Sequence, residues 1–328
     1  MIVESPFRQI RPADSDSLVA WFDELPAQAI AGGKGARLGE MARAGLPVPP
    51  GFVVCAAGFR VFLDTTGGRE VIVRSMDGLD LNAESKLNQA ALSIRDFILS
   101  KPLPEPLETA IRKAYSKLGE SVPVAVRSSA ISEDGEAASF AGQQETYLNV
   151  WGAEAVMQSV RACWASFFTP RAIFYRAQKG SLQDCEMAVV VQAMVKAEKS
   201  GVMFTVDPVR GRRDHLVIEA VFGLGEAAVS GMVTPDHYVV DRTGGSLAHE
   251  FVSVQPVALV YDEQGTGTRQ VELSEEQGSA RVLTDDEIRR LLDLGLKLEA
   301  HFGKPQDIEW SIEGGKLYLL QSRPITTL

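Results

Sequence analysis

Residues 187–207, MAVVVQAMVKAEKSGVMFTVD, separate two parts of the sequence that follow different patterns. Four segments before this stretch are predicted to be helices, two of them from apolar side chains spaced three and four positions apart. They are residues 86–99, 105–118, 154–168 and 171–178. From residue 187 onward, short runs rich in β-branched residues predict strands. These runs are residues 187–195, 201–207, 215–222 and 237–241. A helix-rich first half and a strand-rich second half indicate an α+β protein with two lobes and a cleft between them.

Other segments complete this outline. Residues 122–126 predict a strand, and Thr284 with Glu287 forms a capping box that marks the start of a helix. Residues 307–325, DIEWSIEGGKLYLLQSRPI, predict a β-hairpin, and residues 32–51 are expected to form a loop, a short helix and a second loop. We expect three parts along the chain: a polar, loosely held N-terminal segment over residues 1–20, a first lobe over residues 21–190 and a second lobe over residues 191–328.

The composition argues against several classes of protein. The chain has 328 residues, 45% of them hydrophobic, and a net charge of −10. Bulk affinity for nucleic acid or an anionic membrane is not expected, because both require a basic surface. Cys55, Cys163 and Cys185 form no C-x-x-C pair, which argues against a disulfide scaffold or a zinc site. Apolar runs are too short to span a bilayer, and the N-terminal stretch lacks the apolar region of a signal peptide. We therefore expect a cytoplasmic protein.

Two loops carry a cation among small residues. Residues 32–35, GGKG, would bring backbone N–H groups and one ammonium to a phosphate. They are not a P-loop, because Lys34 is followed by Gly35 rather than Ser or Thr; a flexible turn is the alternative. Arg127 ends a predicted strand and precedes a loop through residues 139–146, an arrangement that can hold and cover a triphosphate. A structural arginine beside an acidic loop is the alternative there.

The predicted hairpin places charged side chains on one face. Asp307 and Glu309 are two positions apart and therefore point to the same side of their strand. With a three-residue turn at 313–315, Asp307 lies opposite Gln321, and Gln321 and Arg323 share that side; a two-residue turn at the glycines would move Gln321 to the other side. Two carboxylates, an amide oxygen and a guanidinium suit a clamp for Mg²⁺ and a triphosphate. A solvent-exposed charged face is the alternative, although apolar residues alternate with these four.

Two further features are given structural interpretations. Residues 223–228, GLGEAA, match the loose dinucleotide pattern G-x-G-x-x-A, but the repeated βαβ units of a dinucleotide-binding domain are missing from the pattern. We expect a tight turn near a nucleotide rather than a nicotinamide or flavin site. The histidines lack the sequence context of a nucleophile or a metal cluster and are expected to be structural. They are His215, His237, His249 and His301.

Six stretches of the chain, in this order, resemble the ATP-binding domain of phosphoenolpyruvate synthases. They are GGKGARLGEMARAGLPVPPGFVV, VAVRSSAISEDGEAASFAGQQETYLNV, CWASFFTPRAIFYR, VVVQAMVKAEKSGVMFTVDPV, VIEAVFGLGEAAVSGMVTPDHYVV and PQDIEWSIEGGKLYLLQSRPIT. Pyruvate phosphate dikinase and rifampicin phosphotransferase have a similar domain. The resemblance covers roughly residues 25–328. It implies a variant of the ATP-grasp fold, in which ATP lies between two lobes.

The resemblance also implies roles for individual residues, carried over by motif. Lys34, Arg127 and Arg323 are expected to contact the phosphates of ATP and to act in catalysis. The loop expected to close over the phosphates contains Ser139, Phe140, Ala141, Gly142, Gln143 and Thr146. Gln192, Met194 and Val195 are expected to line the adenine pocket. Glu309 and Gln321 are expected to bind Mg²⁺ with Asp307 close by, and Glu219 is expected to reach the ribose.

Full-length members of this family continue into a swivelling domain whose histidine accepts the phosphoryl group, and a further domain passes it to pyruvate or another acceptor. Nothing in this chain resembles that histidine motif. The resemblance thus implies a unit that binds Mg-ATP, transfers a phosphoryl or pyrophosphoryl group to a histidine on a separate domain or subunit, and releases AMP and phosphate. We expect a natural subunit, as in enzymes similar to phenylphosphate synthase, rather than an excised domain. An ATP sensor without phosphate transfer and a direct small-molecule kinase are the alternatives, and the sequence does not specify the final acceptor.

Overall fold

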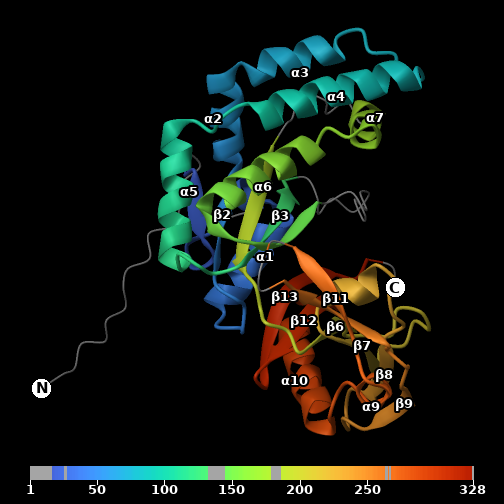
Figure 1. Cartoon of the computed structure of the whole chain (residues 1–328). Helices are drawn as coiled ribbons and strands as arrows, with labels where there is room; N and C mark the ends of the chain where they lie inside the picture. The colour runs from blue at the N-terminus through green and yellow to red at the C-terminus, as the bar shows by residue number, and fades with distance from the viewer. Residues whose placement is uncertain are drawn as a thin grey trace, which may run out of the picture.

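The computed structural model describes residues 17–25, 28–131, 145–178, 186–262, 265 and 267–326. Figure 1 shows two bodies, one formed by the blue-to-green segments and one by the yellow-to-red segments. Each body is built on one antiparallel sheet, and helices cover the sheets. This arrangement confirms the expected α+β class.

The first sheet has five strands in the order β1-β2-β5-β3-β4, and neighbouring strands are antiparallel. The strands are β1 (Val19–Trp21), β2 (Gly51–Val54), β3 (Val124–Ala130), β4 (Thr146–Val150) and β5 (Met187–Ala193). The run MAVVVQA forms the central strand β5 and is buried from Met187 to Gln192, since both faces of this sheet are covered. β1 begins at Val19, inside the segment that was expected to be loosely held.

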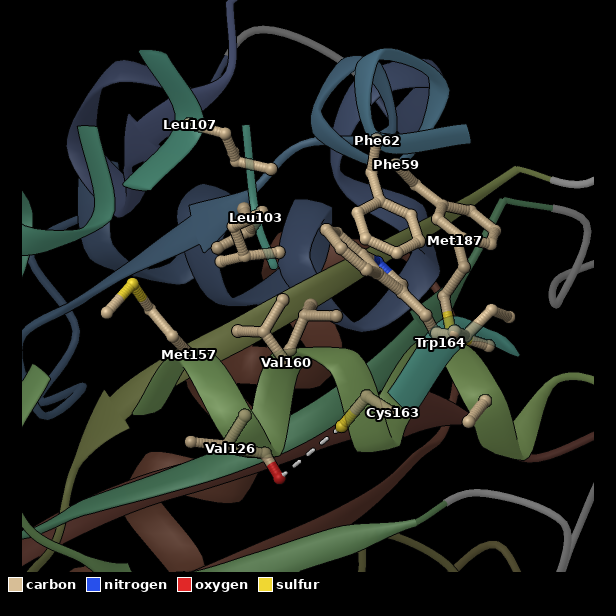
Figure 2. Close-up of a cluster of buried hydrophobic side chains, with 14 of the residues drawn as sticks. Phe59, Phe62, Leu103, Leu107, Val126, Met157, Val160, Cys163, Trp164 and Met187 are labelled. Atoms are coloured by element: carbon tan, nitrogen blue, oxygen red, sulfur yellow. Dashed lines mark hydrogen bonds between the residues drawn. The ribbon is translucent and has the colours of Figure 1, made fainter. Parts of the chain in front are cut away.

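Helices enclose a large apolar core on one face of this sheet. They are α2 (Ala56–Thr66), α3 (Gly68–Met76), α4 (Glu84–Ser100), α5 (Glu105–Leu118), α6 (Gly152–Ser166) and α7 (Pro170–Gln178). At the centre, the ring of Trp164 stacks on Phe59 at 4.9 Å and lies 5.2 Å from Phe62 (Figure 2). Burial of these rings and of the aliphatic side chains around them is the main stabilising contribution in this body.

The second sheet has six strands in the order β13-β12-β6-β7-β8-β9, again with antiparallel neighbours. The strands are β6 (Lys199–Phe204), β7 (His215–Phe222), β8 (Asp236–Asp241), β9 (Leu247–Phe251), β12 (Gln306–Glu313) and β13 (Lys316–Pro324). The helix α10 (Asp285–Phe302) packs against this sheet, and its N-terminus is the expected capping box of Thr284 and Glu287. The hairpin predicted near the C-terminus is β12–β13.

A second core joins the two sheets. It contains Val53 and Val190 from the first sheet, Leu38 from α1 (Gln28–Arg43), and Ile308 and Trp310 from the second sheet, together with apolar residues of α10. The segment between β5 and β6 links the bodies covalently, and within it the N–H of Met194 donates to Pro123 O at 2.8 Å. The boundary expected at residue 190 falls inside β5, which belongs entirely to the first sheet.

Smaller elements complete the second body. A separate two-stranded ribbon consists of β10 (Val257–Tyr261) and β11 (Thr268–Glu272), and the short helices are α8 (Glu226–Val229) and α9 (Glu275–Gly278). A single-turn helix, η1 (Phe22–Glu24), follows β1. Within the described parts of the chain, no helix combines the length and the apolar character that crossing a bilayer requires.

One expected element differs from the structure. Residues 32–51 were expected to begin with a loop, whereas α1 already starts at Gln28 and continues to Arg43. Gly32 interrupts this helix with a φ of 67°, a left-handed conformation that glycine adopts without strain. The expected loop is therefore a single-residue break inside a helix.

Candidate active site

The break at Gly32 lets α1 approach the end of β3 closely. A Cβ atom on Gly32 would lie 2.3 Å from Ser129 O, so a side chain cannot be accommodated there. The N–H of Gly35 donates to Ser129 Oγ at 3.1 Å, and this hydroxyl donates to Ala31 O at 2.8 Å. Lys34 Nζ donates to Ser128 O at 2.9 Å, which holds its ammonium beside β3. The glycine-rich segment and the Arg127-Ser128-Ser129 segment thus form one structural unit.

Arg127 connects the first sheet with the β12–β13 hairpin of the second. It is 9% exposed, and its Nη1 donates to Leu320 O at 3.0 Å. Its Nη2 donates to Glu309 Oε2 at 2.9 Å and to Gln321 Oε1 at 2.8 Å. Its Nε is buried without a hydrogen-bond partner among the described residues. A buried donor of this kind is normally satisfied, so this one indicates a place for an acceptor from outside the described residues.

The hairpin forms its charged face in a different way from the one expected. The turn has two residues, Gly314 and Gly315, both with positive φ, and Asp307 pairs with Arg323 rather than with Gln321. The register shifts between Glu309 and Trp310, which leaves Leu320 as an extra residue on β13. This β-bulge places Gln321 opposite Glu309 and Arg323 opposite Asp307, so all four side chains lie on one side of the hairpin. The expectation that a two-residue turn would move Gln321 to the other side was wrong, since Gln321 lies directly opposite Glu309.

A row of cross-strand partners extends this face over three more strands. Gln321 pairs with Glu309, Glu309 with Val202, Val202 with Glu219, and Glu219 with His237. Paired residues of antiparallel strands share a face, so these side chains project from one side of the sheet. The opposite side carries Ile308, Met203, Ile218 and Tyr238, which are buried in the shared core.

The electrostatics of this face favour a cation. Burial raises the pKa of Asp307 above its ordinary value, and the negative charges of Glu309 and Glu219 raise it further. Arg323 opposes this shift, because its Nε and Nη2 contact Asp307 Oδ2 at 2.7 Å. Three carboxylates are therefore close enough to influence one another.

The sequence matches the family described as pyruvate phosphate dikinase, AMP/ATP-binding domain, over residues 28–328. The chain belongs to this family. It is 50% identical over 323 residues to a probable phosphoenolpyruvate synthase of Methanocaldococcus jannaschii, covering 96% of this chain and 27% of the relative. It is 51% identical over 317 residues to that of Archaeoglobus fulgidus, covering 94% of this chain and 42% of the relative. A rifampicin phosphotransferase of a Streptomyces species is 42% identical over 318 residues, covering 96% of this chain and 36% of the relative.

The chain spans less than half the length of each of these relatives. It is an ATP-binding domain of the phosphoenolpyruvate synthase and pyruvate phosphate dikinase type, and its two-bodied antiparallel architecture agrees with the ATP-grasp-like fold expected for that family.

In this dikinase-type domain, the residues expected at the phosphates and the metal come together from both sheets. Arg127, Glu309 and Gln321 are in direct contact, and Arg323 with Asp307 lies two residues along the same strands. Lys34 is held at the neighbouring end of β3. The ribose candidate, Glu219, lies in the same cross-strand row.

The residues expected around the adenine lie at the connection between the sheets. Gln192 on β5 is 2% exposed, and its amide nitrogen has no partner among the described residues. Met194 packs against the small apolar cluster that contains Val221 and Leu224, and Val195 is 6% exposed. Thr146 pairs with Arg127 across β3 and β4. The other residues of the expected covering loop, Ser139, Phe140, Ala141, Gly142 and Gln143, lie outside the described residues.

The donor set fits a magnesium ion shared with phosphates. Glu309, Gln321 and Asp307 offer hard oxygen atoms on one face of the hairpin. Across the described part of the chain, no three His, Cys, Asp or Glu side chains gather closely enough to enclose a metal by themselves. Mg²⁺ is typically bound by one or two carboxylates together with phosphate oxygens and water, so an incomplete protein shell is what such a site requires.

His237 is a site neighbour that the sequence pattern did not reveal. Its Nδ1 lies 3.8 Å from Glu219 Oε1, on the row that leads to Glu309. Recognising it requires the register of β7 and β8, which no local motif specifies. His215 and His301 contact Asp214 and Glu40 instead, which are not candidate site residues. In the GLGEAA motif, Gly223 has a φ of 75° and forms an isolated bridge with Leu259, and α8 begins at Glu226.

Proposed function

We propose that this chain is the Mg-ATP-binding catalytic unit of a dikinase, which transfers a phosphoryl or pyrophosphoryl group from ATP to a histidine on a separate domain or subunit. The observation that carries the proposal is the convergence of Arg127 from the first sheet with Glu309 and Gln321 from the second. A binding face made by both sheets suits a triphosphate held between two lobes. We place the division between the lobes in the segment that connects β5 with β6.

In this proposal the chain contributes position and charge rather than a covalent intermediate. Lys34, Arg127 and Arg323 are the cations that would hold the phosphates in line and stabilise the charge that develops during transfer. Glu309 and Gln321, with Asp307 nearby, would hold Mg²⁺, which neutralises phosphate charge. Gln192, Met194 and Val195 would orient the adenine, and the loop over residues 139–146 would exclude water.

The proposed acceptor is a histidine on a separate domain or subunit, not one of the four histidines of this chain. All four histidines of the chain are accounted for: His215 and His301 contact other acidic residues, His237 faces Glu219, and His249 lies on the exposed strand β9. The relatives are more than twice as long as the chain, so they contain sequence in which a histidine-bearing domain can lie. We propose that a swivelling domain or subunit receives the group and passes it to a pyruvate-like or phenol-like acceptor in the cytoplasm, with AMP and phosphate as the other products.

The decisive experiment measures the nucleotide product. The purified chain is incubated with ATP and Mg²⁺, alone and with a candidate histidine-bearing partner, and AMP is quantified while β-labelled phosphate is traced on the partner. Partner-dependent AMP with label on the partner is the expected result. ADP as the product would indicate a direct kinase or ATPase, and tight ATP binding without any turnover would indicate a sensor; either would contradict the proposal.

A further inference from the structure

Arg127 contacts the same oxygen atoms that the proposed function assigns to the metal. Its Nη2 lies 2.9 Å from Glu309 Oε2 and 2.8 Å from Gln321 Oε1, so one nitrogen bridges both side chains. Its Nη1 is fixed by Leu320 O at 3.0 Å, which holds the guanidinium over the hairpin. A positive charge therefore already occupies the position between the two proposed ligands.

A divalent cation cannot bind to this pair while Arg127 remains in place. A metal ion at this position would face the positive charge of the guanidinium. Mg²⁺ requires its ligand oxygens at about 2.1 Å, which would bring its charge within a few ångström of Nη2. Arg127 is only 9% exposed, so solvent screens the resulting repulsion poorly. Metal binding by Glu309 and Gln321 therefore requires that the guanidinium moves away or that an anion compensates its charge.

The surroundings of Arg127 suit a second interaction partner for the guanidinium, a bound anion. Its Nε is buried and has no partner among the described residues, which leaves a donor for an incoming anion. Phosphate oxygens accept charge-assisted hydrogen bonds from arginine and often accept two at once. The ammonium of Lys34 lies at the same end of β3, where it donates to Ser128 O. A triphosphate bound near these two cations would compete directly with Glu309 and Gln321 for Arg127.

We propose that Arg127 is an internal counter-ion, which keeps the metal ligands occupied until the triphosphate of the nucleotide draws the guanidinium away. Metal alone then binds weakly, and nucleotide and metal bind with positive coupling. By linkage, each strengthens the binding of the other by the same factor. The inference rests on the proposed function for the identity of the site, and it adds the order in which the site assembles.

The test is a titration with Mn²⁺ in the absence of any nucleotide, in which free Mn²⁺ is followed by electron paramagnetic resonance. Wild type is compared with Arg127→Met, which removes the charge and its donors at similar side-chain length. We expect the variant to bind Mn²⁺ at least about tenfold more tightly, within the usual range of coupling between sites. Arg290→Met is the matched control, because Arg290 donates to Gly315 O at the tip of the same hairpin and contacts neither ligand. Its Mn²⁺ affinity is expected to equal that of wild type.

Arg127→Lys provides a second variant if Arg127→Met does not fold. Lysine keeps the charge but loses the planar fork that bridges two side chains, so a gain of several-fold in Mn²⁺ affinity is expected. Equal Mn²⁺ affinity in wild type and the Arg127 variants, or an equal gain in Arg290→Met, would overturn the counter-ion proposal. Because the titration contains no nucleotide, its failure is distinct from failure of the dikinase proposal, which would appear as the wrong nucleotide product.

Discussion

Arg323 has a different environment from Arg127, although both contact an acidic residue of β12. Its Nε and Nη2 meet Asp307 Oδ2 at 2.7 Å, and its side chain is 59% exposed. An exposed guanidinium held by one carboxylate can turn towards a phosphate without breaking a buried network. For Arg323→Ala we expect transfer to the partner histidine to fall on the order of a hundredfold or more, as when one preorganised charge donor is removed. Label on the partner, measured over time, gives the rate.

Arg212→Ala is the control for that substitution. Arg212 forms a comparable pair with Asp214 at 2.7 Å, and both side chains are more than half exposed. Because neither residue touches a candidate site residue, the transfer rate is expected to stay within about twofold of wild type, as for most surface pairs. If Arg323→Ala retained activity within a few-fold of wild type, Arg323 would have no part in the mechanism.

The buried thiols provide a prediction about reactivity. Burial raises the pKa of Cys55 to about 12, and it raises the pKa of Cys163, which lies in the core beneath Trp164 (Figure 2). Because only the thiolate reacts and a raised pKa lowers its population, roughly one Cys55 in ten thousand is ionised at pH 8. Neither thiol is expected to react with iodoacetamide in the folded protein, whereas both react in guanidinium chloride. Peptide mass spectrometry measures this, and fast labelling of Cys163 in native buffer would mean that α6 opens locally.

At the level of elements, Gly201 on β6 fixes how β6, β7 and β12 pack. A Cβ atom there would lie 1.8 Å from Glu219 O and 2.8 Å from Trp310 Cζ2. Gly201→Ala is therefore expected to push β6 and β7 apart and to lower the free energy of unfolding by about 3 kcal/mol or more, as severe overpacking does. Denaturant unfolding measures the change.

Gly225→Ala is the matched control for Gly201→Ala. The φ of Gly225 is −61°, and an added Cβ would meet Ser200 Cβ at an ordinary 3.5 Å. We expect a change within about 0.5 kcal/mol, as for substitutions that meet no steric obstacle. Equal losses of stability in the two variants would show that the loss in Gly201→Ala does not come from the close approach of the strands at Gly201.

The hairpin shows which parts of an element can be predicted from sequence. Two glycines between alternating apolar residues are sufficient to predict a hairpin, and the spacing of Asp307 and Glu309 places both on one side. The bulge at Leu320 could not be predicted, because no glycine or other special residue marks it. It depends instead on the pairing of β12 with both β6 and β13, which is non-local. The bulge keeps Gln321 opposite Glu309 and leaves the Leu320 carbonyl to accept from Arg127.

The same limit applies to the site. The motifs identified Lys34, Arg127 and Glu309 as separate candidates, and the resemblance to a family suggested that they act together. Their actual contacts join residues up to 194 positions apart, and no local pattern encodes such pairs. The close approach of Gly32 in α1 to Ser129 on a distant strand could not be predicted for a related reason, because the two residues are far apart in the sequence.

At the scale of the whole molecule, several contacts hold the two sheets together in addition to the segment that connects β5 with β6. The shared core packs α1 between them, and Arg127 reaches from β3 to β12 and β13. A further connection is the β10–β11 ribbon, which bridges to the second sheet at Gly223 and Leu259. The segment between its strands is bound by Asn149 at the end of β4, in the first sheet. In Figure 1, β11 extends from the second body towards the first.

Asn149 is suited to this role by both its backbone and its side chain. Its φ is 54°, a left-handed conformation that asparagine tolerates better than most residues. The buried amide nitrogen donates to the carbonyls of Asp262, Gly265 and Gly267 at 2.8–3.1 Å, and the amide oxygen accepts from Trp151 Nε1. For Asn149→Ala we expect a loss of about 3 kcal/mol in the free energy of unfolding, from the unsatisfied buried groups and the backbone strain together.

Asn149→Gly separates these two contributions, because glycine adopts the left-handed conformation without strain. It is expected to be about 1 kcal/mol more stable than Asn149→Ala, while both lose the same hydrogen bonds. Hydrogen exchange monitored by mass spectrometry should show faster exchange over residues 257–272 in both variants and unchanged exchange in β12 and β13, since the hairpin has its own connection through Arg127. Asn88→Ala, on the exposed side of α4, is the control and should leave the ribbon protected. Unchanged protection of the ribbon in Asn149→Ala would mean that its contacts with the second sheet alone hold it in place, and that the ribbon does not connect the two sheets.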